Sequence, residues 1–236
     1  MQLPKRIWKN SVSEWGDYLK INDRPIENME AILNSFVYSS SNIERNIYDA
    51  GLHHIVLSQN ITAQNRELTV TFESERAISE FTSLLLSKDL TIDTEDGYLY
   101  DCILTKAPNI NHIGRDYYSC TYELSAIKKG HKQIIKLSYQ KTKAKIIGTY
   151  PVMPVITITP NRNMNTFMLN EYKIKNLKKD KPIIIDSVCK LIQQEGMNKF
   201  SDVEFKKWPV LQTGVNTFTL SSDGADVTIE YHPIYL

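Results

Sequence analysis

The sequence predicts a mostly β protein with one clear helix, made of a β-rich N-terminal part and an antiparallel β-sandwich at its C-terminus. Along most of the 236 positions, short runs of β-branched and aromatic residues alternate with polar residues, as in half-buried strands. The clearest helical stripe lies at residues 75–87. After Gly130 only strand patterns remain, separated by turn residues about every 8–12 positions, which is typical of a sandwich.

The N-terminal part opens with strand-like and ambiguous segments. Residues 17–23 alternate in polarity and predict a strand. Residues 25–36 fit a helical apolar stripe, yet their flanks suit an extended loop, so both readings stay open. Residues 51–74 predict two strands on either side of a polar Gln-Asn segment.

A helix should follow at Ser74. Its hydroxyl can cap the first turn, where Glu75 complements the helix dipole. Ile78, Phe81 and Leu85 then recur on one face, which should be buried.

The N-terminal part closes with three more strands. Residues 90–108 predict a hairpin that turns at Asp96-Gly97, and residues 116–130 predict a further strand. Cys102 and Cys120 have apolar neighbours there and are expected in the core. With Cys189 they make an odd, widely spaced set, which favours reduced thiols and folding in a cytoplasm.

The C-terminal part should be a sandwich of short strands. Its strand patterns lie at residues 132–140, 143–150, 152–160, 165–175, 181–188, 190–194, 216–220 and 226–231. The last two are expected to form a closing hairpin, with Asp223-Gly224 supplying positive φ values at its turn. The sequence therefore predicts two domains, residues 1–130 and 133–236, with a boundary near residues 128–147.

Charge differs between these two parts. Residues 1–130 hold 13 basic and 18 acidic residues, a net charge of −5, and residues 131–236 hold 15 and 9, a net charge of +6. Chance in a lysine-rich protein explains this split as well as two distinct surfaces do. The lysines at 173–181 lie in a turn region without interleaved stacking aromatics, which argues against a nucleic-acid platform.

Motifs for catalysis, cofactors and metals are missing. The sequence has no nucleophile elbow, phosphate-binding loop or zinc-protease motif. His53 and His54 are adjacent, so on a strand they would point to opposite faces and could not share a metal. With no apolar run of 18 residues and no secretory h-region, no membrane span or signal peptide is expected. We expect neither an enzyme nor a cofactor.

Four C-terminal segments resemble the distal tail protein (Dit) family of siphophages. They are residues 148–160, 181–198, 208–220 and 227–236. In that family a Pro-x-Ile-x-Ile strand is followed by an Ile-Asp strand, then by an aromatic-Pro-x-Leu-x-x-Gly-x-Asn step. The matching residues here are Pro154, Ile156, Ile158, Ile185, Asp186, Trp208, Pro209, Leu211, Gly214 and Asn216.

The resemblance implies a structural virion protein. Six copies would close into a ring through their N-terminal domains, around a channel that lets DNA pass without specific binding. The ring would join the tail tube protein to the tail-tip or baseplate hub protein, at the distal end of a virion whose parts are made in the host cytoplasm. The C-terminal domain would be a galectin-like sandwich outside the ring.

The motif residues then become determinants of the fold. Trp208 and Leu211 would bury apolar area, Pro209 and Gly214 would set the backbone, and Asn216 would bond a turn. The ring interface is expected among exposed apolar residues of the N-terminal part. The candidates are Ile43, Ile47, Leu52 and Ile55.

The sequence leaves two other functions open. A carbohydrate-binding module could use Asn161, Arg162, Asn163 and Trp208 on a galectin-like sheet, although fold alone does not confer function. A glycosidase or peptidase is the third, since carboxylate glycosidases carry no short signature.

Overall fold

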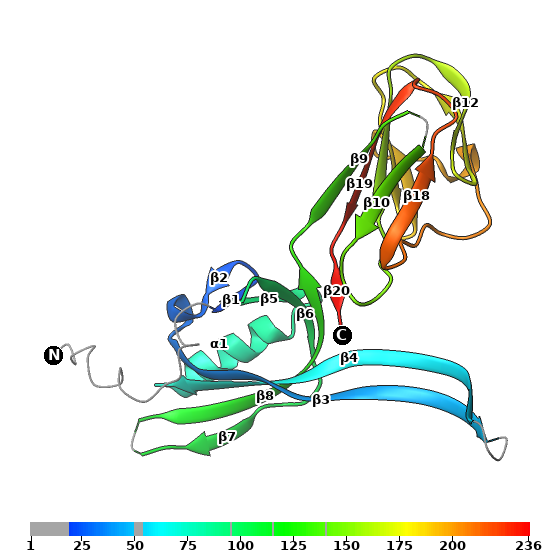
Figure 1. Cartoon of the computed structure of the whole chain (residues 1–236). Coiled ribbons are helices and arrows are strands. Elements are labelled where there is room, and N and C mark those ends of the chain that lie inside the picture. The colour runs from blue at the N-terminus through cyan, green and yellow to red at the C-terminus, as the bar shows by residue number, and fades with distance from the viewer. Residues whose placement is uncertain (1–18, 50–53, 95, 115, 140) are drawn as a thin grey trace. The chain divides into compact units, whose positions relative to one another are not determined.

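The computed structural model describes residues 19–49, 54–94, 96–114, 116–139 and 141–236, with side chains described outside residues 40–62. The chain divides into two compact units, one running to Lys129 and the other spanning Gly130–Tyr235 (Figure 1). Among the described residues the structure is mostly β with one α-helix, as predicted.

The N-terminal unit is built on one sheet with the strand order β2-β1-β5-β6-β8-β4-β3, and β7 also pairs with β8. Its elements are β1 (Leu19–Ile21), β2 (Arg24–Pro25), the 3-10 helix η1 (Ile26–Met29), β3 (Ala31–Asp49), β4 (His54–Phe72), α1 (Glu75–Leu85), β5 (Leu90–Thr94), β6 (Tyr98–Leu104), β7 (Asn109–His112) and β8 (Tyr118–Gly130). The predicted hairpin at residues 90–108 is confirmed, since β5 and β6 pair antiparallel.

Two N-terminal predictions need correction. Residues 54–72 form one continuous strand, not two, because the polar segment stays in the ladder: Gln59 lies opposite Arg45, and Asn60 opposite Glu44. Residues 25–36 form neither a long helix nor a loop. A single 3-10 turn is followed directly by β3, whose pairing with β4 overrides the helical spacing.

Helix α1 begins where it was predicted. The Ser74 hydroxyl accepts a hydrogen bond from the Ala77 amide at 3.1 Å, which satisfies one free donor of the first turn. Ala77, Ile78, Phe81 and Leu85 are buried. Figure 1 shows the helix lying against one face of the sheet.

The N-terminal core forms between that helix and the sheet. Alternate residues of β4 and β8 share the covered face, because Leu68 lies opposite Tyr122 and Val70 opposite Cys120. The ring of Phe81 lies 5.1 Å from that of Phe72 and 5.5 Å from that of Tyr122, between centroids. Cys102 and Cys120 are buried, as predicted, and all three cysteines are free.

The C-terminal unit stacks several small sheets around a second core. One sheet has the order β16-β15-β14-β11-β19-β9, a second has the order β12-β13-β17, and β10 pairs with β18. The elements are β9 (Gln133–Leu137), β10 (Lys141–Ile146), β11 (Val155–Pro160), β12 (Met164–Leu169), β13 (Tyr172–Leu177), β14 (Ile183–Asp186), β15 (Leu191–Gln194), β16 (Met197–Asn198), η2 (Phe200–Asp202), β17 (Val203–Glu204), β18 (Gly214–Thr219), β19 (Ala225–Tyr231) and β20 (Ile234–Tyr235).

The predicted closing hairpin is wrong. Strand β18 pairs with β10, whereas β19 pairs with β11 and β9, so residues 220–224 cross between two sheets. Asp223 and Gly224 do not have positive φ values. Space at Gly224 is tight instead, because a Cβ atom there would lie 2.4 Å from the Met164 sulfur and that side chain would have to move.

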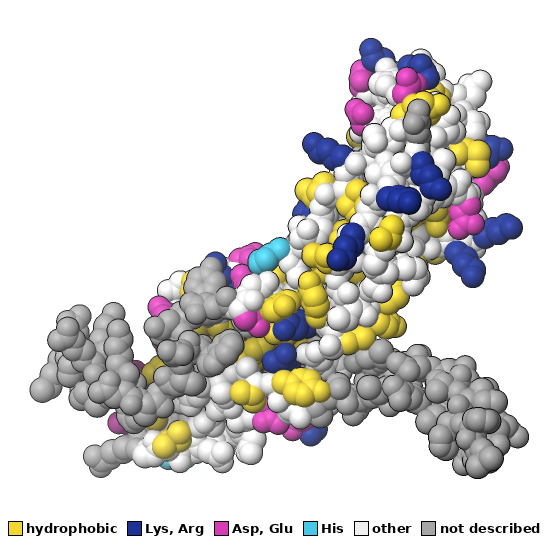
Figure 2. Space-filling model, in the orientation of Figure 1, with side chains coloured by type: hydrophobic (Ala, Val, Ile, Leu, Met, Phe, Trp, Pro, Cys, Tyr) yellow, Lys and Arg dark blue, Asp and Glu magenta, His cyan; other side chains and the backbone are white. Residues whose placement is uncertain are grey.

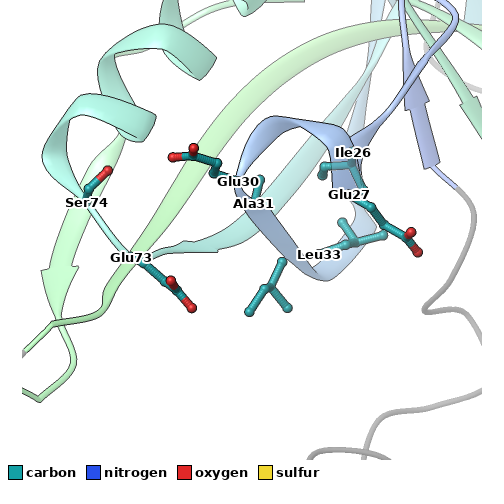
Figure 3. Close-up of a pocket in the computed structure, with 8 residues that line it drawn as sticks. Ile26, Glu27, Glu30, Ala31, Leu33, Glu73 and Ser74 are labelled. Carbon is teal, nitrogen blue, oxygen red and sulfur yellow. The ribbon is translucent and has the colours of Figure 1, made fainter. Parts of the chain in front are cut away.

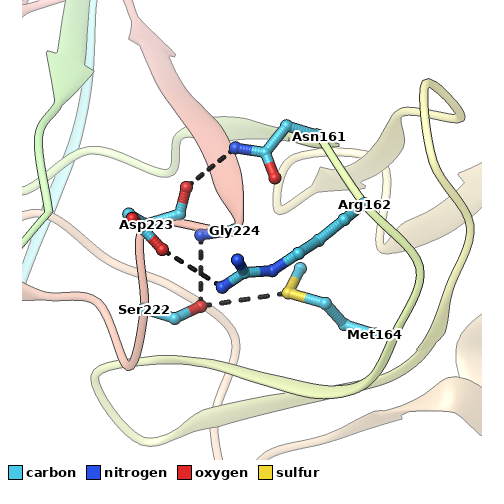
Figure 4. A network of polar contacts seen from close by, with 6 residues as sticks. All are labelled: Asn161, Arg162, Met164, Ser222, Asp223 and Gly224. Carbon is cyan, nitrogen blue, oxygen red and sulfur yellow. Dashed lines mark hydrogen bonds and ion pairs between the residues drawn. The ribbon is translucent and has the colours of Figure 1, made fainter.

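The crossing is tied to the loop between β11 and β12 (Figure 4). The Asn161 side-chain amide donates to the Asp223 carbonyl at 2.8 Å, and Arg162 pairs with the Asp223 carboxylate at 3.1 Å. The Gly224 amide donates to the Ser222 hydroxyl at 3.2 Å. These contacts explain why a turn-like sequence serves as an arch between sheets.

We predict that Phe81→Ala lowers the free energy of unfolding of the N-terminal unit by about 3–5 kcal/mol, because it removes a buried ring between helix and sheet. Glu80→Gln, on the exposed side of the same helix, should change it by less than about 0.5 kcal/mol. Denaturant titration of both variants measures this. If Phe81→Ala and Glu80→Gln had equal free energies of unfolding, packing of α1 against the sheet would not stabilise the core.

Candidate assembly surfaces and motif residues

The longest structural feature of the N-terminal unit is the ribbon formed by β3 and β4. These strands pair from Ala31 and Phe72 out to Asp49 and His54. Pairing of β4 with β8, however, ends at Gln64. The rest of the pair therefore extends past the sheet as a two-stranded arm, which Figure 1 shows protruding from it. On its other side β3 pairs with no strand among the described residues.

An arginine is held among three aromatic rings where the arm leaves the sheet. The guanidinium carbon of Arg66 lies 4.7 Å from the ring centroid of Tyr100, 5.5 Å from that of Phe36 and 5.6 Å from that of Tyr38. Its Nη2 atom donates to Gln64 at 3.1 Å and to the Tyr100 hydroxyl at 3.4 Å. Cation–π contacts of this kind stabilise a fixed geometry.

Tyr100 completes this cluster as a hydrogen-bond donor. Burial raises the pKa of Tyr100 to about 12, so its hydroxyl keeps its proton over the physiological pH range. That hydroxyl donates to the Asp96 carboxylate at 3.3 Å. The root of the arm is thus connected to the β5–β6 turn.

Three of the four predicted interface residues fall on the arm. The backbones of Ile43 and Ile47 lie on β3, opposite Ile61 and Val56, and that of Ile55 lies on β4. Their side chains and the whole of Leu52 lie outside the described residues, so their exposure stays a prediction. Closer to the sheet, β3 exposes Ile32, Val37 and Tyr38, by 55%, 47% and 51%. Register shifts in β3 between Leu33 and Ser35 and between Tyr38 and Ser40 interrupt simple alternation, so the sequence gave no clear signal for these exposed residues.

A groove of about 690 Å³ lies beside the first residues of β3 (Figure 3). The Glu27, Glu30 and Glu73 carboxylates line it together with apolar side chains, among them Ile26 and Leu33.

No group of three or more metal-ligating side chains that could hold an ion occurs in the part of the chain that the structure describes. Likewise, no described helix is long and apolar enough to cross a membrane.

The first two motifs lie in the C-terminal core. Ile156 and Ile158 on β11 are buried, and Ile156 pairs with the equally buried Ile185 on β14. The Pro154 carbonyl accepts the Ser187 amide at 3.1 Å. The Asp186 carboxylate accepts the amides of residues 188 and 189, both at 2.9 Å, and so closes the turn after β14.

The third motif begins with an aromatic cluster. Trp208 is only half-buried; its ring lies 5.0 Å from that of Phe205 and 6.1 Å from that of Phe200. Pro209 and Leu211 are buried. Leu211 also exchanges two backbone hydrogen bonds with Val152, at 2.8 and 3.0 Å.

Gly214 and Asn216 then form the turn into β18. Gly214 has φ +88°, a conformation that favours glycine. The Asn216 side chain donates to the carbonyls of Gln212 and Gly214, at 2.6 and 3.2 Å, and accepts the Gln212 amide at 3.1 Å. Each polar atom of the amide therefore serves the turn.

One glycine of equal importance went unnoticed in the sequence. Gly148 has φ +112°, and a Cβ atom there would lie 2.9 Å from the Ile234 carbonyl oxygen. The neighbouring Thr149 amide donates to that same oxygen at 2.9 Å. Only the folded chain brings residues 148 and 234 together, so local sequence gave no signal.

The polar residues considered for sugar binding are engaged within the chain. Asn161 and Arg162 bind the crossing at Asp223 (Figure 4), and the Asn163 side chain accepts the Lys179 amide at 2.8 Å. Trp208 packs in its aromatic cluster. This arrangement does not favour the carbohydrate-binding alternative.

Comparison with known proteins agrees with the family resemblance. Residues 147–235 match the family described as siphovirus-type tail component, C-terminal domain. The chain is similar to the crystal structure of SPP1 Dit, with a TM-score of 0.74 and 11% identity over 92% of this chain and 98% of that one. No curated protein matches.

Two structures of the phage P2 baseplate in its activated conformation are similar as well. The one with Ca has a TM-score of 0.50 and 12% identity, and the one with Sr has 0.50 and 13%. Each alignment covers 87% of this chain and 92% of the other. Fold and matched domain together define a structural component of a phage tail. Residues 147–235 thus match the family that the sequence motifs resemble, and the chain as a whole is similar in fold to SPP1 Dit.

We predict that Gly214→Ala costs about 1–2 kcal/mol, because its positive φ is strained for alanine while no atom lies within 4 Å of the added Cβ. Gly148→Ala should cost about 1–3 kcal/mol more, because its Cβ also meets the Ile234 backbone. Thermal denaturation of the two variants compares them. An equal loss would show that the close approach at Ile234 has no energetic role.

Trp208→Ala should destabilise the C-terminal unit by about 2 kcal/mol, which is less than the cost for a fully buried ring. Trp208→Phe, which keeps a ring against Phe205, should recover about half of the loss. Chemical denaturation provides the values. If Trp208→Ala left stability unchanged, the ring would be free of its neighbours and available for stacking on a ligand.

Proposed function

We propose that copies of this chain assemble through the N-terminal unit into a six-fold ring at the distal end of the virion tail. The ring connects the tail tube protein to the tail-tip or baseplate hub protein. The observation that carries the proposal is the long edge of β3, which pairs with no further strand in the part of the chain that the structure describes, together with the arm beyond it. Six-fold closure comes from the family resemblance.

The arm supports assembly because an uncovered arm is energetically unfavourable in a single protomer. An isolated two-stranded ribbon is marginally stable in water, and a free edge strand presents unpaired amides and carbonyls. The apolar side chains of Ile32, Val37 and Tyr38 beside that edge add exposed area. A neighbouring copy that covers edge and arm removes both problems, and a head-to-tail contact repeated by rotation closes a ring.

The position in the tail is inferred from similar proteins. SPP1 Dit is described as a paradigm of the hub adsorption apparatus in phages that infect Gram-positive bacteria, and two further similar structures are of the phage P2 baseplate. We assign this chain the same place, with a connecting role in host attachment and no chemistry of its own.

In this proposal the N-terminal and C-terminal parts have different roles. Residues 1–130 form the ring, and their net charge of −5 keeps the channel from retaining DNA, since like charges repel. Residues 133–236 fold separately into a galectin-like sandwich on the outside. The motif residues from Pro154 to Asn216 keep that sandwich rigid.

Val37→Asp should weaken ring formation by at least tenfold in concentration, because it puts a charge on the apolar edge of β3. As a matched control, Ile134→Asp introduces the same charge at a 57% exposed position of β9 and should leave assembly unchanged. Size-exclusion chromatography with light scattering over a concentration series reads out both. Ring formation unaffected by Val37→Asp but lost in Ile134→Asp would place the interface in the wrong unit.

A further inference from the structure

One stretch of the C-terminal unit contains no acidic residue at all. Residues 131–170 hold six Lys or Arg and no Asp or Glu. Three of these lysines, Lys141, Lys143 and Lys145, alternate along β10. All three are exposed, and Figure 2 shows Lys and Arg side chains projecting from the visible face of this unit.

The outer face of the β10–β18 pair is therefore a row of ammonium groups beside hydroxyl groups. Lys141 lies opposite Thr219, Lys143 opposite Thr217 and Lys145 opposite Val215. Successive lysines are about 6.8 Å apart along the strand, because side chains on one face recur every second residue. We call these six residues the lysine face.

The charges of this face are uncompensated. Several lysines elsewhere in the unit have carboxylate partners, such as Lys181 with Glu195 and Lys199 with Asp202. Lys141, Lys143 and Lys145 form no ion pair with any carboxylate among the described residues. Strand β18 contributes no acidic residue either. The row has a net charge of +3.

We propose that the lysine face binds an extended phosphodiester polymer that lacks bases, of the poly(glycerol phosphate) type found on bacterial surfaces. Lysine ammonium groups bind phosphate as point charges, and threonine hydroxyls donate to phosphate oxygens. A regularly spaced row suits a polymer with regularly spaced charges. This inference goes beyond the connecting role and does not depend on ring formation.

Composition of the face favours such a polymer over other anions. Lysine is depleted in protein–protein interfaces, whose centres are apolar and aromatic, and Val215 is the one large apolar side chain here. Single-stranded nucleic acid is held by aromatic rings that stack on its bases, and none of the six side chains is aromatic. A phosphodiester backbone without bases remains the best match.

The test uses the full chain and a fluorescent poly(glycerol phosphate) oligomer, with binding followed by anisotropy at several salt concentrations. Three phosphate contacts predict that log K falls with log salt with a slope of about −2. The triple variant K141Q/K143Q/K145Q should bind at least tenfold more weakly at low salt, with an unchanged thermal midpoint. A thymidine oligonucleotide with the same number of phosphates should bind no more tightly than the glycerol polymer.

A matched variant separates the row from charge in general. K178Q/K179Q/K181Q removes the same charge from a loop where Lys179 and Lys181 already have carboxylate partners, and it should keep full binding. Equal losses in both variants, or no binding by the wild type, would overturn the proposal. So would tighter binding of the oligonucleotide. Aggregation of the first variant with binding intact would also overturn it, since the lysines would then only prevent strand-edge pairing.

Discussion

The long antiparallel pairing of β3 with β4 is the constraint on which the rest of the N-terminal unit depends. It carries the side chains that pack under α1, and it extends farther than any neighbouring strand can cover. The Arg66 cluster fixes its direction where it leaves the sheet. Among the described residues, the edge of β3 thus has no strand partner within the chain, and a further chain could cover it together with the apolar side chains beside it.

The C-terminal unit follows a different principle, because its family motifs serve rigidity. Asp186 and Asn216 close turns with their own side chains, while Gly148 allows two backbone segments to approach closely and Gly224 leaves space for the Met164 side chain. No group of three or more metal-ligating side chains occurs among the described residues. Such a rigid unit is suited to a structural role, and any ligand would bind to its exposed surface.

Local patterns predicted the elements whose signal is local. The cap and stripe of α1, the β5–β6 hairpin and the buried isoleucines of β11 and β14 followed from a few neighbouring residues. Contacts between distant residues could not be predicted in this way. The unbroken length of β4 depends on β3, the separate sheets of β18 and β19 depend on their partners, and Gly224 depends on Met164. The function was predicted from several motifs that together resemble a family, because no single motif predicted it.

Native mass spectrometry of the full chain, alone and mixed with the tail tube protein, tests the central claim most directly. A ring predicts a dominant species with six times the mass of one chain, and no ladder of open oligomers, because a heterologous contact that closes leaves no free end. A monomer at every concentration and in both mixtures would contradict the account, and so would an open-ended series of masses.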